Sequence, residues 1–436
     1  MLKSILRQKM LLLSLAGIAT LTFSCKEDEV SPTASAATSA LILSYEMVPD
    51  DLTIEYYGDP AYTYDFAVDW GDGTVDSNIT LGNGNLLISH TYASTGRYDV
   101  SITGTFPGWN NGETGNTLPG FTSAFLREVK QWGNLKYKTL AGAFYGTDDV
   151  KISATDVPDF SQLTSLVNCF NQSQNFSADV SNWNTSTVTD LSAAFSFSRN
   201  FNADLSNWDV SAVKNMSSAF FASENFSGSI SQWDVSQVTD MSVLCQNVEN
   251  FSDNISNWDV SSVLSFKAAF GSSPSLTNGF NQNISGWNTG SATNMSSMFI
   301  GNVFFNQDIG NWNVSSVEKF EFMFSDATSF NQDLSAWNTA AATSFKSMFN
   351  DASAFDFSLG SWNISSAVDM SGMLNNSGVS RNNYNQTLIG WESQANTPSN
   401  IVLGAFGRVS SGSGVTARQS LTDTYNWTIT GDSQMR

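Results

Sequence analysis

The segment WDVSAVKNMSSAF at residues 208–220 recurs 25 residues later as WDVSQVTDMSVLC at residues 233–245. A fixed period of this length is typical of a repeat architecture, in which one unit cannot bury its apolar residues alone and neighbouring units must stack. The same tryptophan column runs through the middle of the chain, with one four-residue insertion between its two halves: Trp183, Trp208, Trp233, Trp258, Trp287, Trp312, Trp337 and Trp362.

Further apolar columns follow each tryptophan at distances of 5, 8 and 12 residues. This spacing predicts one face of a short helix. A serine three residues after the tryptophan lies where it would cap that helix, as in Ser211, Ser236, Ser261 and Ser315. The segment FNADLSNW at residues 201–208 predicts a short strand. We therefore expect about ten units of strand plus helix over residues 129–378, stacked with a parallel sheet.

Two polar or aromatic columns allow a structural and a functional interpretation. A buried Trp removes about 200 Å² from water, so we expect the tryptophan column to form the core rather than a platform for carbohydrate stacking. An asparagine also recurs six residues before the tryptophan, at Asn202, Asn281, Asn306 and Asn331. We expect a structural ladder of hydrogen bonds along the stack, and a row that binds a ligand is the alternative.

The N-terminus has the features of an export signal. Cations at residues 3–9 precede an apolar run at residues 10–23, which is too short to span a bilayer. The run ends in LTFSC at residues 21–25, which resembles the cleavage site of bacterial lipoproteins. We expect residues 1–24 to be a lipoprotein signal peptide and Cys25 to carry the lipid. An ordinary signal peptide with an incidental cysteine is the alternative.

Residues 25–39 are rich in Ser, Thr, Ala and acidic side chains, a composition that predicts a flexible tether. The acidic residues just after Cys25 resemble the surface-export signals of some Gram-negative lipoproteins. We therefore expect a lipid-anchored protein at the outer membrane or cell surface of a Gram-negative bacterium, with the anchor as its only contact with the membrane.

Residues 40–106 alternate apolar and polar side chains in short runs, which predicts a small β-domain. Its motifs DWGDGT (residues 69–74) and HTYASTGRYDVSITG (residues 90–104) closely resemble the PKD family of immunoglobulin-like sandwiches. The resemblance implies that Trp70 and Tyr92 are core residues. PKD-like domains usually act as spacers or weak binding modules.

The acidic side chains near the turn of this domain raise the question of a metal site. Asp69, Asp72 and Asp76 could together hold calcium, but carboxylates around a tight turn more often accept hydrogen bonds from its backbone amides. We expect the second role. His90, the single histidine of the chain, is expected to be structural.

Composition excludes several functional classes. The chain has 19 Lys and Arg against 40 Asp and Glu, a net charge of -21, so nucleic-acid binding is not expected. A single histidine removes most acid–base and zinc chemistry.

Cys169 and Cys245 fall three repeats apart, about 14 Å at the usual strand spacing, and a disulfide needs less than about 7 Å. Both are expected to be free, buried thiols.

The repeat columns together resemble the BspA-like leucine-rich-repeat surface proteins in their 25-residue variant. That resemblance implies a mixed fold, a PKD/immunoglobulin-like β-sandwich followed by an α/β leucine-rich-repeat-type solenoid. Residues 107–128 would connect the two parts and residues 379–436 would form a C-terminal cap and tail. The insertion at residues 271–278 is expected to be a surface bulge, with a binding loop as the alternative.

The functional expectation is a non-enzymatic adhesion or binding protein that acts through the repeats, without a cofactor. The resemblance implies extracellular or host matrix proteins, glycans or other cells as partners. A passive spacer or envelope scaffold without a ligand is the alternative. A hydrolase is not expected, because acidic residues such as Asp209, Asp234 and Asp259 recur by column and so have a repeated structural role. Weak structural calcium binding by these columns stays open.

Overall fold

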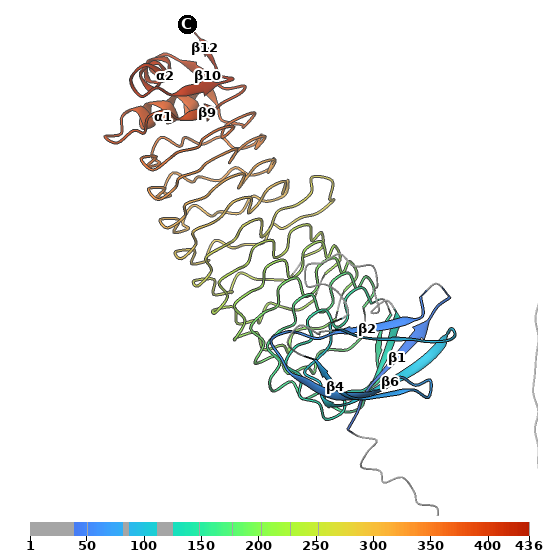
Figure 1. Ribbon diagram of the computed structural model, residues 1–436. Helices are drawn as coiled ribbons and strands as arrows, with labels where there is room; N and C mark the ends of the chain where they lie inside the picture. Colours follow the sequence, from blue (N-terminus) through green and yellow to red (C-terminus); the bar gives the residue numbers. More distant parts are fainter. Residues whose placement is uncertain are drawn as a thin grey trace, which may run out of the picture.

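The structure is a computed structural model that describes residues 39–435 except 50, 82–86, 111–124, 148, 177, 202, 227 and 252. The signal peptide, nearly all of the tether, Cys25 and Asn202 lie outside the described residues. Figure 1 shows a β-rich N-terminal part, a long row of stacked coils and a C-terminal cap. The elements are β1 (Leu41–Met47), β2 (Thr53–Tyr57), β3 (Tyr64–Asp69), β4 (Val75–Leu81), β5 (Leu87–Thr91), β6 (Gly96–Thr105), β7 (Leu126–Gln131), β8 (Lys151–Ile152), α1 (Arg381–Glu392), β9 (Val402–Gly404), β10 (Val409–Ser411), α2 (Ser413–Thr424), β11 (Thr428–Thr430) and β12 (Ser433–Met435).

The N-terminal part contains a six-stranded sheet in the order β4-β3-β6-β1-β7-β8 and a separate pair, β2 and β5. Alternating burial along β3 and β6 directs apolar side chains into a core. Trp70 and Tyr92 are both buried there, and the Tyr92 hydroxyl donates to the Trp70 carbonyl oxygen at 2.9 Å. The prediction that these two residues are core is confirmed.

The same sheet continues into the coils. β1 pairs antiparallel with β7, which crosses the boundary expected at residue 129, and β7 pairs parallel with β8. Trp109 lies against the first coil, where its indole N–H donates to the Ala143 carbonyl oxygen at 3.0 Å. Gly108 permits this approach, since a Cβ there would overlap the Thr139 carbonyl oxygen. The N-terminal part therefore covers the first end of the coil stack.

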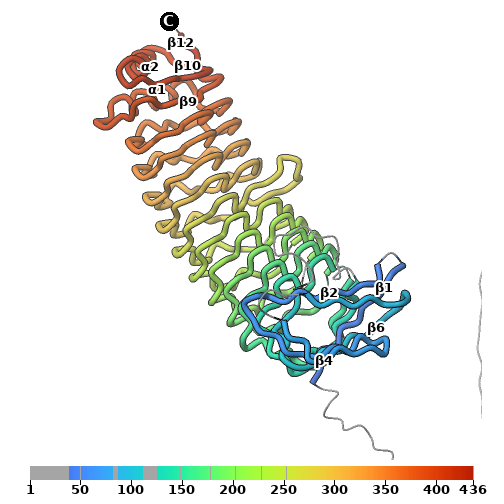
Figure 2. The backbone as a smooth tube through the Cα atoms, viewed as in Figure 1, coloured from blue at the N-terminus to red at the C-terminus, as the bar shows by residue number. Residues whose placement is uncertain are grey.

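The coils follow the 25-residue period, and Figure 2 shows them as a regular series of backbone loops. One residue of each coil, seven after the tryptophan, forms a parallel bridge with its equivalent in the next coil. These residues are Ser165, Asp190, Asn215, Asp240, Ser265, Asn294, Lys319, Ser344 and Asp369. Within the described residues, the coils after β8 have no longer parallel strand pairing than these isolated bridges.

Consecutive turns follow each bridge. In the coil of Trp183, the Leu191 and Ala193 amides donate to the next coil, while the Ala194 amide donates back to the Leu191 carbonyl oxygen at 3.1 Å. Ala193 has a positive φ of 52°, and Phe197, four residues later, has 55°. Most coils repeat these two left-handed positions. Backbone amides thus alternate between bonds within a coil and bonds to the next one.

The predicted α/β leucine-rich-repeat-type fold is wrong. The described residues contain only two helices, α1 and α2, and both follow the coils. A helix cannot form where two residues per coil are left-handed and every second amide bonds to the neighbouring coil. The predicted cap Ser211 instead donates its hydroxyl to the Asp209 side chain at 2.6 Å, which closes a local turn. The residues predicted as a strand, 201–208, contain no strand among those described.

The tryptophan column forms the core, as predicted. Each ring from Trp208 to Trp362 is buried. Each indole N–H donates to a main-chain carbonyl oxygen of the preceding coil at 2.8–3.2 Å, three residues before that coil's tryptophan. Phenylalanine rings stack beside this column, with centroids of Phe299 and Phe324 at 5.7 Å. Each coil is therefore fixed to its neighbour by apolar contact and by a buried hydrogen bond.

The C-terminal segment closes the other end. Trp391 in α1 continues the column, because its indole N–H donates to the Leu359 carbonyl oxygen at 2.9 Å. β9 bridges to the last coil and β11 pairs parallel with β9. Arg418 in α2 donates to the Ile429 carbonyl oxygen of β11 and binds the buried Asp432 carboxylate at 2.7 Å. Neither helix in the described part of the chain has the length and apolar character needed to cross a bilayer.

Replacing Trp312 by Phe tests the indole bond. We expect Trp312→Phe to lose about 1–3 kcal/mol, because it leaves the Ile284 carbonyl oxygen buried without its 3.0 Å donor. Thr293→Val is the matched control: it removes an exposed hydroxyl bond to the preceding coil, at 3.3 Å, and should lose less than about 1 kcal/mol. The midpoints of urea unfolding measure both losses, provided that the dependence of the free energy on urea concentration is unchanged. Equal losses would contradict the role given to the indole.

Candidate binding surface

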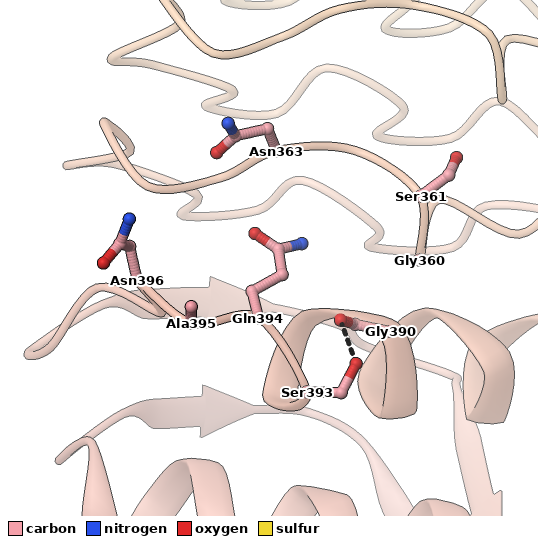
Figure 3. A pocket seen from close by; sticks show the side chains of 8 residues that line it. All are labelled: Gly360, Ser361, Asn363, Gly390, Ser393, Gln394, Ala395 and Asn396. Carbon is pink, nitrogen blue, oxygen red and sulfur yellow. Dashed lines mark hydrogen bonds between the residues drawn. The ribbon is translucent and has the colours of Figure 1, made fainter.

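The described pocket lies where the last coil meets the cap, with a volume of about 440 Å³ (Figure 3). Its polar groups are used to hold the cap. Gln394 accepts from the Ile364 amide at 3.2 Å and donates to the Trp362 carbonyl oxygen at 2.6 Å. The Ser393 hydroxyl donates to the Gly390 carbonyl oxygen. The pocket is therefore a structural junction, and the surfaces of the coils are the better candidates.

The first surface is an acidic row, made of the residues four before and one after each tryptophan. Asp204 and Asp209 each accept a hydrogen bond from the amide two residues later, at 2.9 and 3.0 Å. The Ser211 hydroxyl also donates to Asp209, and this bond is the main reason that its pKa lies below the usual value. The same arrangement recurs at Asp234, Asp259 and Asp333. These carboxylates close turns in their own coils.

The second surface is a threonine row, six residues after the tryptophan. Each hydroxyl donates to the main-chain carbonyl oxygen of the residue one coil earlier, at 3.1–3.3 Å. The row consists of Thr164, Thr189, Thr239, Thr293 and Thr343. Its hydroxyl protons are already donated within the protein, so the row offers a ligand acceptor oxygens and methyl groups but no free hydroxyl donor.

The third surface consists of asparagine ladders. The backbone N–H groups of Asn306 and Asn331 donate to the side-chain oxygen of the asparagine one coil earlier, at 3.0 and 2.9 Å. The predicted structural ladder is confirmed for Asn281, Asn306 and Asn331, whereas Asn202 is outside the described residues. A second ladder was not predicted: Asn175, Asn200, Asn225 and Asn250 bond side chain to side chain at 2.9–3.1 Å. The sequence feature that could have predicted this second ladder is an asparagine eight residues before the tryptophan.

The fourth surface differs, and we name it the neutral turn face. It comprises turn positions of five successive coils, most of them half-buried or exposed, and contains no charged residue: residues 141–142, 145–146, 167–168, 171–172, 192–193, 196–197, 217–218, 221–222, 242–243 and 246–247. Within the described part of the chain, the side chains of Ser217, Ser218, Gln246 and Asn247 have no hydrogen-bond partner. Phe197 is 40% exposed on this face.

The carboxylates of the N-terminal domain support its turn. Asp69 accepts from the Gly71 amide at 3.0 Å and Asp72 from the Thr74 amide at 2.9 Å, as expected for turn residues. Asp76 instead accepts from the Trp70 indole N–H at 2.9 Å. Among the described residues, no group of three or more His, Cys, Asp or Glu side chains is arranged to hold a metal ion.

His90 packs as a structural residue. Its ring stacks on Trp70, with centroids 4.7 Å apart, and its Nε2 lies 2.8 Å from the Asp72 carboxylate. The prediction of a structural histidine agrees with these contacts.

Cys169 and Cys245 are free and buried, as predicted, and burial raises the pKa of both thiols.

The insertion at residues 271–278 reaches beyond the neighbouring coils (Figure 2). Glu249 holds it from the preceding coil by accepting from the Thr277 amide at 2.9 Å. Asn302 closes the gap that the insertion creates, since its fully buried side chain donates to the Phe280 and Phe270 carbonyl oxygens at 2.8 and 3.2 Å. Most other coils have Ser or Ala at this position, with Thr147 and Val248 as exceptions, and the asparagine was the feature of the sequence that could have been noticed.

The family described as "Mycoplasma protein of unknown function, DUF285" matches the coils at residues 138–247, 214–301 and 275–391. These segments together span more than half of the chain. The chain therefore belongs to this family. No curated protein and no solved structure matches it.

The resemblance to BspA-like leucine-rich-repeat surface proteins with a PKD-like domain is thus corrected. The matching family is a different one, and the coils lack the helix that a leucine-rich repeat of the expected kind contains. The match begins at residue 138, so it gives no support to the PKD assignment of the N-terminal part. The description of the family assigns no function.

Calcium should leave the melting temperature of the protein unchanged. The carboxylates of the N-terminal turn already accept hydrogen bonds from backbone amides or the Trp70 indole, and those of the acidic row close turns. Calorimetry with millimolar calcium and then with a chelator measures this. A melting temperature that rises with calcium and falls on chelation would establish a structural calcium site.

The turn at Asp72 should weaken in acid. Hydrogen bonds from the Thr74 hydroxyl and amide, and then from His90, lower the pKa of Asp72 from 3.8 to about 2. Because the folded pKa is depressed, the stabilisation is complete above about pH 4 and is lost as the pH falls towards about 2. The free energies of unfolding of the wild type and of Asp72→Asn, followed at Trp70, should therefore converge as the pH falls through this interval. A stability difference independent of pH would contradict it.

Proposed function

We propose that the protein is an exported, non-enzymatic binding protein that uses the surface of its coil stack to attach to extracellular or host matrix proteins, glycans or other cells. Cys25 would carry the lipid that holds it at a membrane. The proposal keeps this anchor but not the Gram-negative outer membrane, because the family description names Mycoplasma, bacteria that lack one.

One observation carries the proposal. Three of the four coil surfaces direct their polar groups into bonds within the protein, at the acidic row, the threonine row and the asparagine ladders. On the neutral turn face, Asn171, Gln172 and Ser242 are also bonded within the protein. Its later coils leave the side chains of Ser217, Ser218, Gln246 and Asn247 without partners among the described residues, and Phe197 is partly exposed. A long surface with unpaired donors and acceptors suits recognition of an extended partner.

The placement of acidic groups supports binding rather than catalysis. Catalytic carboxylates need an irregular site in which their pKa values are set apart. Here Asp204, Asp209 and Asp259 have similar surroundings, and hydrogen bonds from a following serine lower the pKa of each. Equivalent groups in equivalent environments cannot divide into an acid and a base.

The alternative of a passive spacer has one observation in its favour. The sheet of the N-terminal part continues through β7 into the first coil, and the coils are then joined by bridges and ladders. Such a continuous series of main-chain and side-chain hydrogen bonds would make a stiff rod, which is what a spacer requires. A spacer does not need unpaired polar groups on one face.

The chain without residues 1–24 tests the proposal against immobilised matrix glycoproteins, neutral and charged polysaccharides, and whole cells. We expect saturable binding at physiological salt that is reduced when Gln246 and Asn247 are both replaced by Ala. The matched control is Asp209→Asn with Asp234→Asn on the acidic row. A sample that is folded by circular dichroism and binds nothing on the panel would favour the spacer.

A further inference from the structure

The neutral turn face is unusual in a protein with a net charge of -21. Its five coils contain no charge at the outward turn positions, whereas equivalent positions of later coils contain Lys267, Glu321 and Lys346. The face itself offers no charged group to a partner, and the nearby Arg199 and Glu224 pair with each other at 3.4 Å. Its partner must be recognised by contact with uncharged groups.

Phe197 occupies a backbone position that is unfavourable for an aromatic residue. Its φ of 55° is in the left-handed region, where a bulky side chain is a genuine outlier. The next two coils place Ala222 and Asn247 at the equivalent position. The repeat enforces this conformation, because most coils have a left-handed residue here, and Phe197 is the only aromatic residue at the position among the described coils.

Packing does not explain this aromatic ring. The Phe197 side chain is 40% exposed and has Phe221 at its edge, with ring centroids 4.9 Å apart and an angle of 77°. Phe221 comes from the next coil, so the two rings form a small aromatic platform across adjacent coils. The Gln174 amide donates to the Phe197 carbonyl oxygen at 2.7 Å and so fixes the turn that holds the ring.

Unpaired hydroxyl and amide groups lie on the following coils of the same face. Ser217 and Ser218 precede the Phe221 turn, and Gln246 and Asn247 follow one coil later. Primary amides donate and accept at once, which matches the hydroxyl groups of a sugar. An aromatic face packs against the C–H face of a pyranose ring through weak C–H contacts and apolar burial.

We propose that the neutral turn face binds an uncharged polysaccharide, with one sugar ring on Phe197 and hydroxyl groups of further sugars on the amides of the next coils. This inference rests on the proposed binding function and specifies its surface and ligand class. An extended glycan fits because the groups lie on successive coils along the stack axis. Affinity should depend little on salt, since no ion pair contributes.

The test uses the chain without residues 1–24 in native gels containing laminarin, dextran or galactomannan, with titration calorimetry on any polysaccharide that retards it. We expect at least one of these neutral polymers to bind, equally at low and high salt. Phe197→Ala should weaken that binding roughly tenfold or more. Phe406→Ala is the matched control, because Phe406 is 61% exposed in the cap, beyond the five coils of this face.

A second variant separates binding from folding. Phe197→Gly removes the ring and also the left-handed strain, because glycine adopts positive φ without penalty. We expect its melting temperature to be equal to or above that of the wild type while binding is lost as in Phe197→Ala. Both variants should keep wild-type binding to dextran sulfate if the wild type binds it at all.

The outcomes distinguish this inference from the broader proposal. Binding of a neutral polysaccharide that survives in both Phe197 variants, or binding only of matrix proteins or charged polymers, would overturn the inference and leave the binding function in place. A folded sample that binds neither these polysaccharides nor anything on the broader panel would overturn both the inference and the proposed binding function. A wild-type dimer that becomes a monomer in Phe197→Ala, measured by light scattering, would show that a second copy occupies this face, and would also overturn the inference.

Discussion

The stack depends on the hydrogen bond between each buried indole N–H and a main-chain carbonyl oxygen of the coil before it. A carbonyl oxygen left buried without a donor costs about 1–3 kcal/mol, and the indole supplies that donor while filling the space between coils. The bond also fixes register, because the acceptor always lies three residues before the preceding tryptophan, as for Trp233 and Leu205. A ring of the same size without the N–H would pack but would not select that register.

This register explains why the coils tolerate unfavourable backbone. Val243 and Phe322 have positive φ values of 61° and 56°, which branched and aromatic residues normally avoid. Left-handed residues turn every second amide towards the next coil, where the Val243 amide, for example, donates to the Lys267 carbonyl oxygen at 2.7 Å. A strain of about 1–2 kcal/mol per residue is thus offset by main-chain bonds that no isolated coil could form. Stability must therefore be shared along the stack, and its ends must be closed by Trp109 and by α1.

These interactions define what the sequence could predict. Burial of the tryptophan column, the ladder at Asn306 and Asn331, and free thiols at Cys169 and Cys245 follow from a residue type repeated at a fixed period, and the structure confirms them. The helix prediction was wrong because apolar residues 5, 8 and 12 positions after the tryptophan suit a helix face and a series of turns equally well. Backbone dihedrals decide between the two, and Ala193 or Ser218 gives no local signal of a left-handed conformation.

The candidate surface was missed for a related reason. Sequence columns show what recurs, whereas the neutral turn face is defined by the absence of charge over five coils and by Phe197, at a position where the residue type varies from coil to coil. Recurring groups at the acidic row and the asparagine ladders proved to be bonded within the protein. In a periodic structure, a repeated residue serves the repeat, because every coil has the same structural need. The residues that depart from the period without improving the packing are where recognition should be sought.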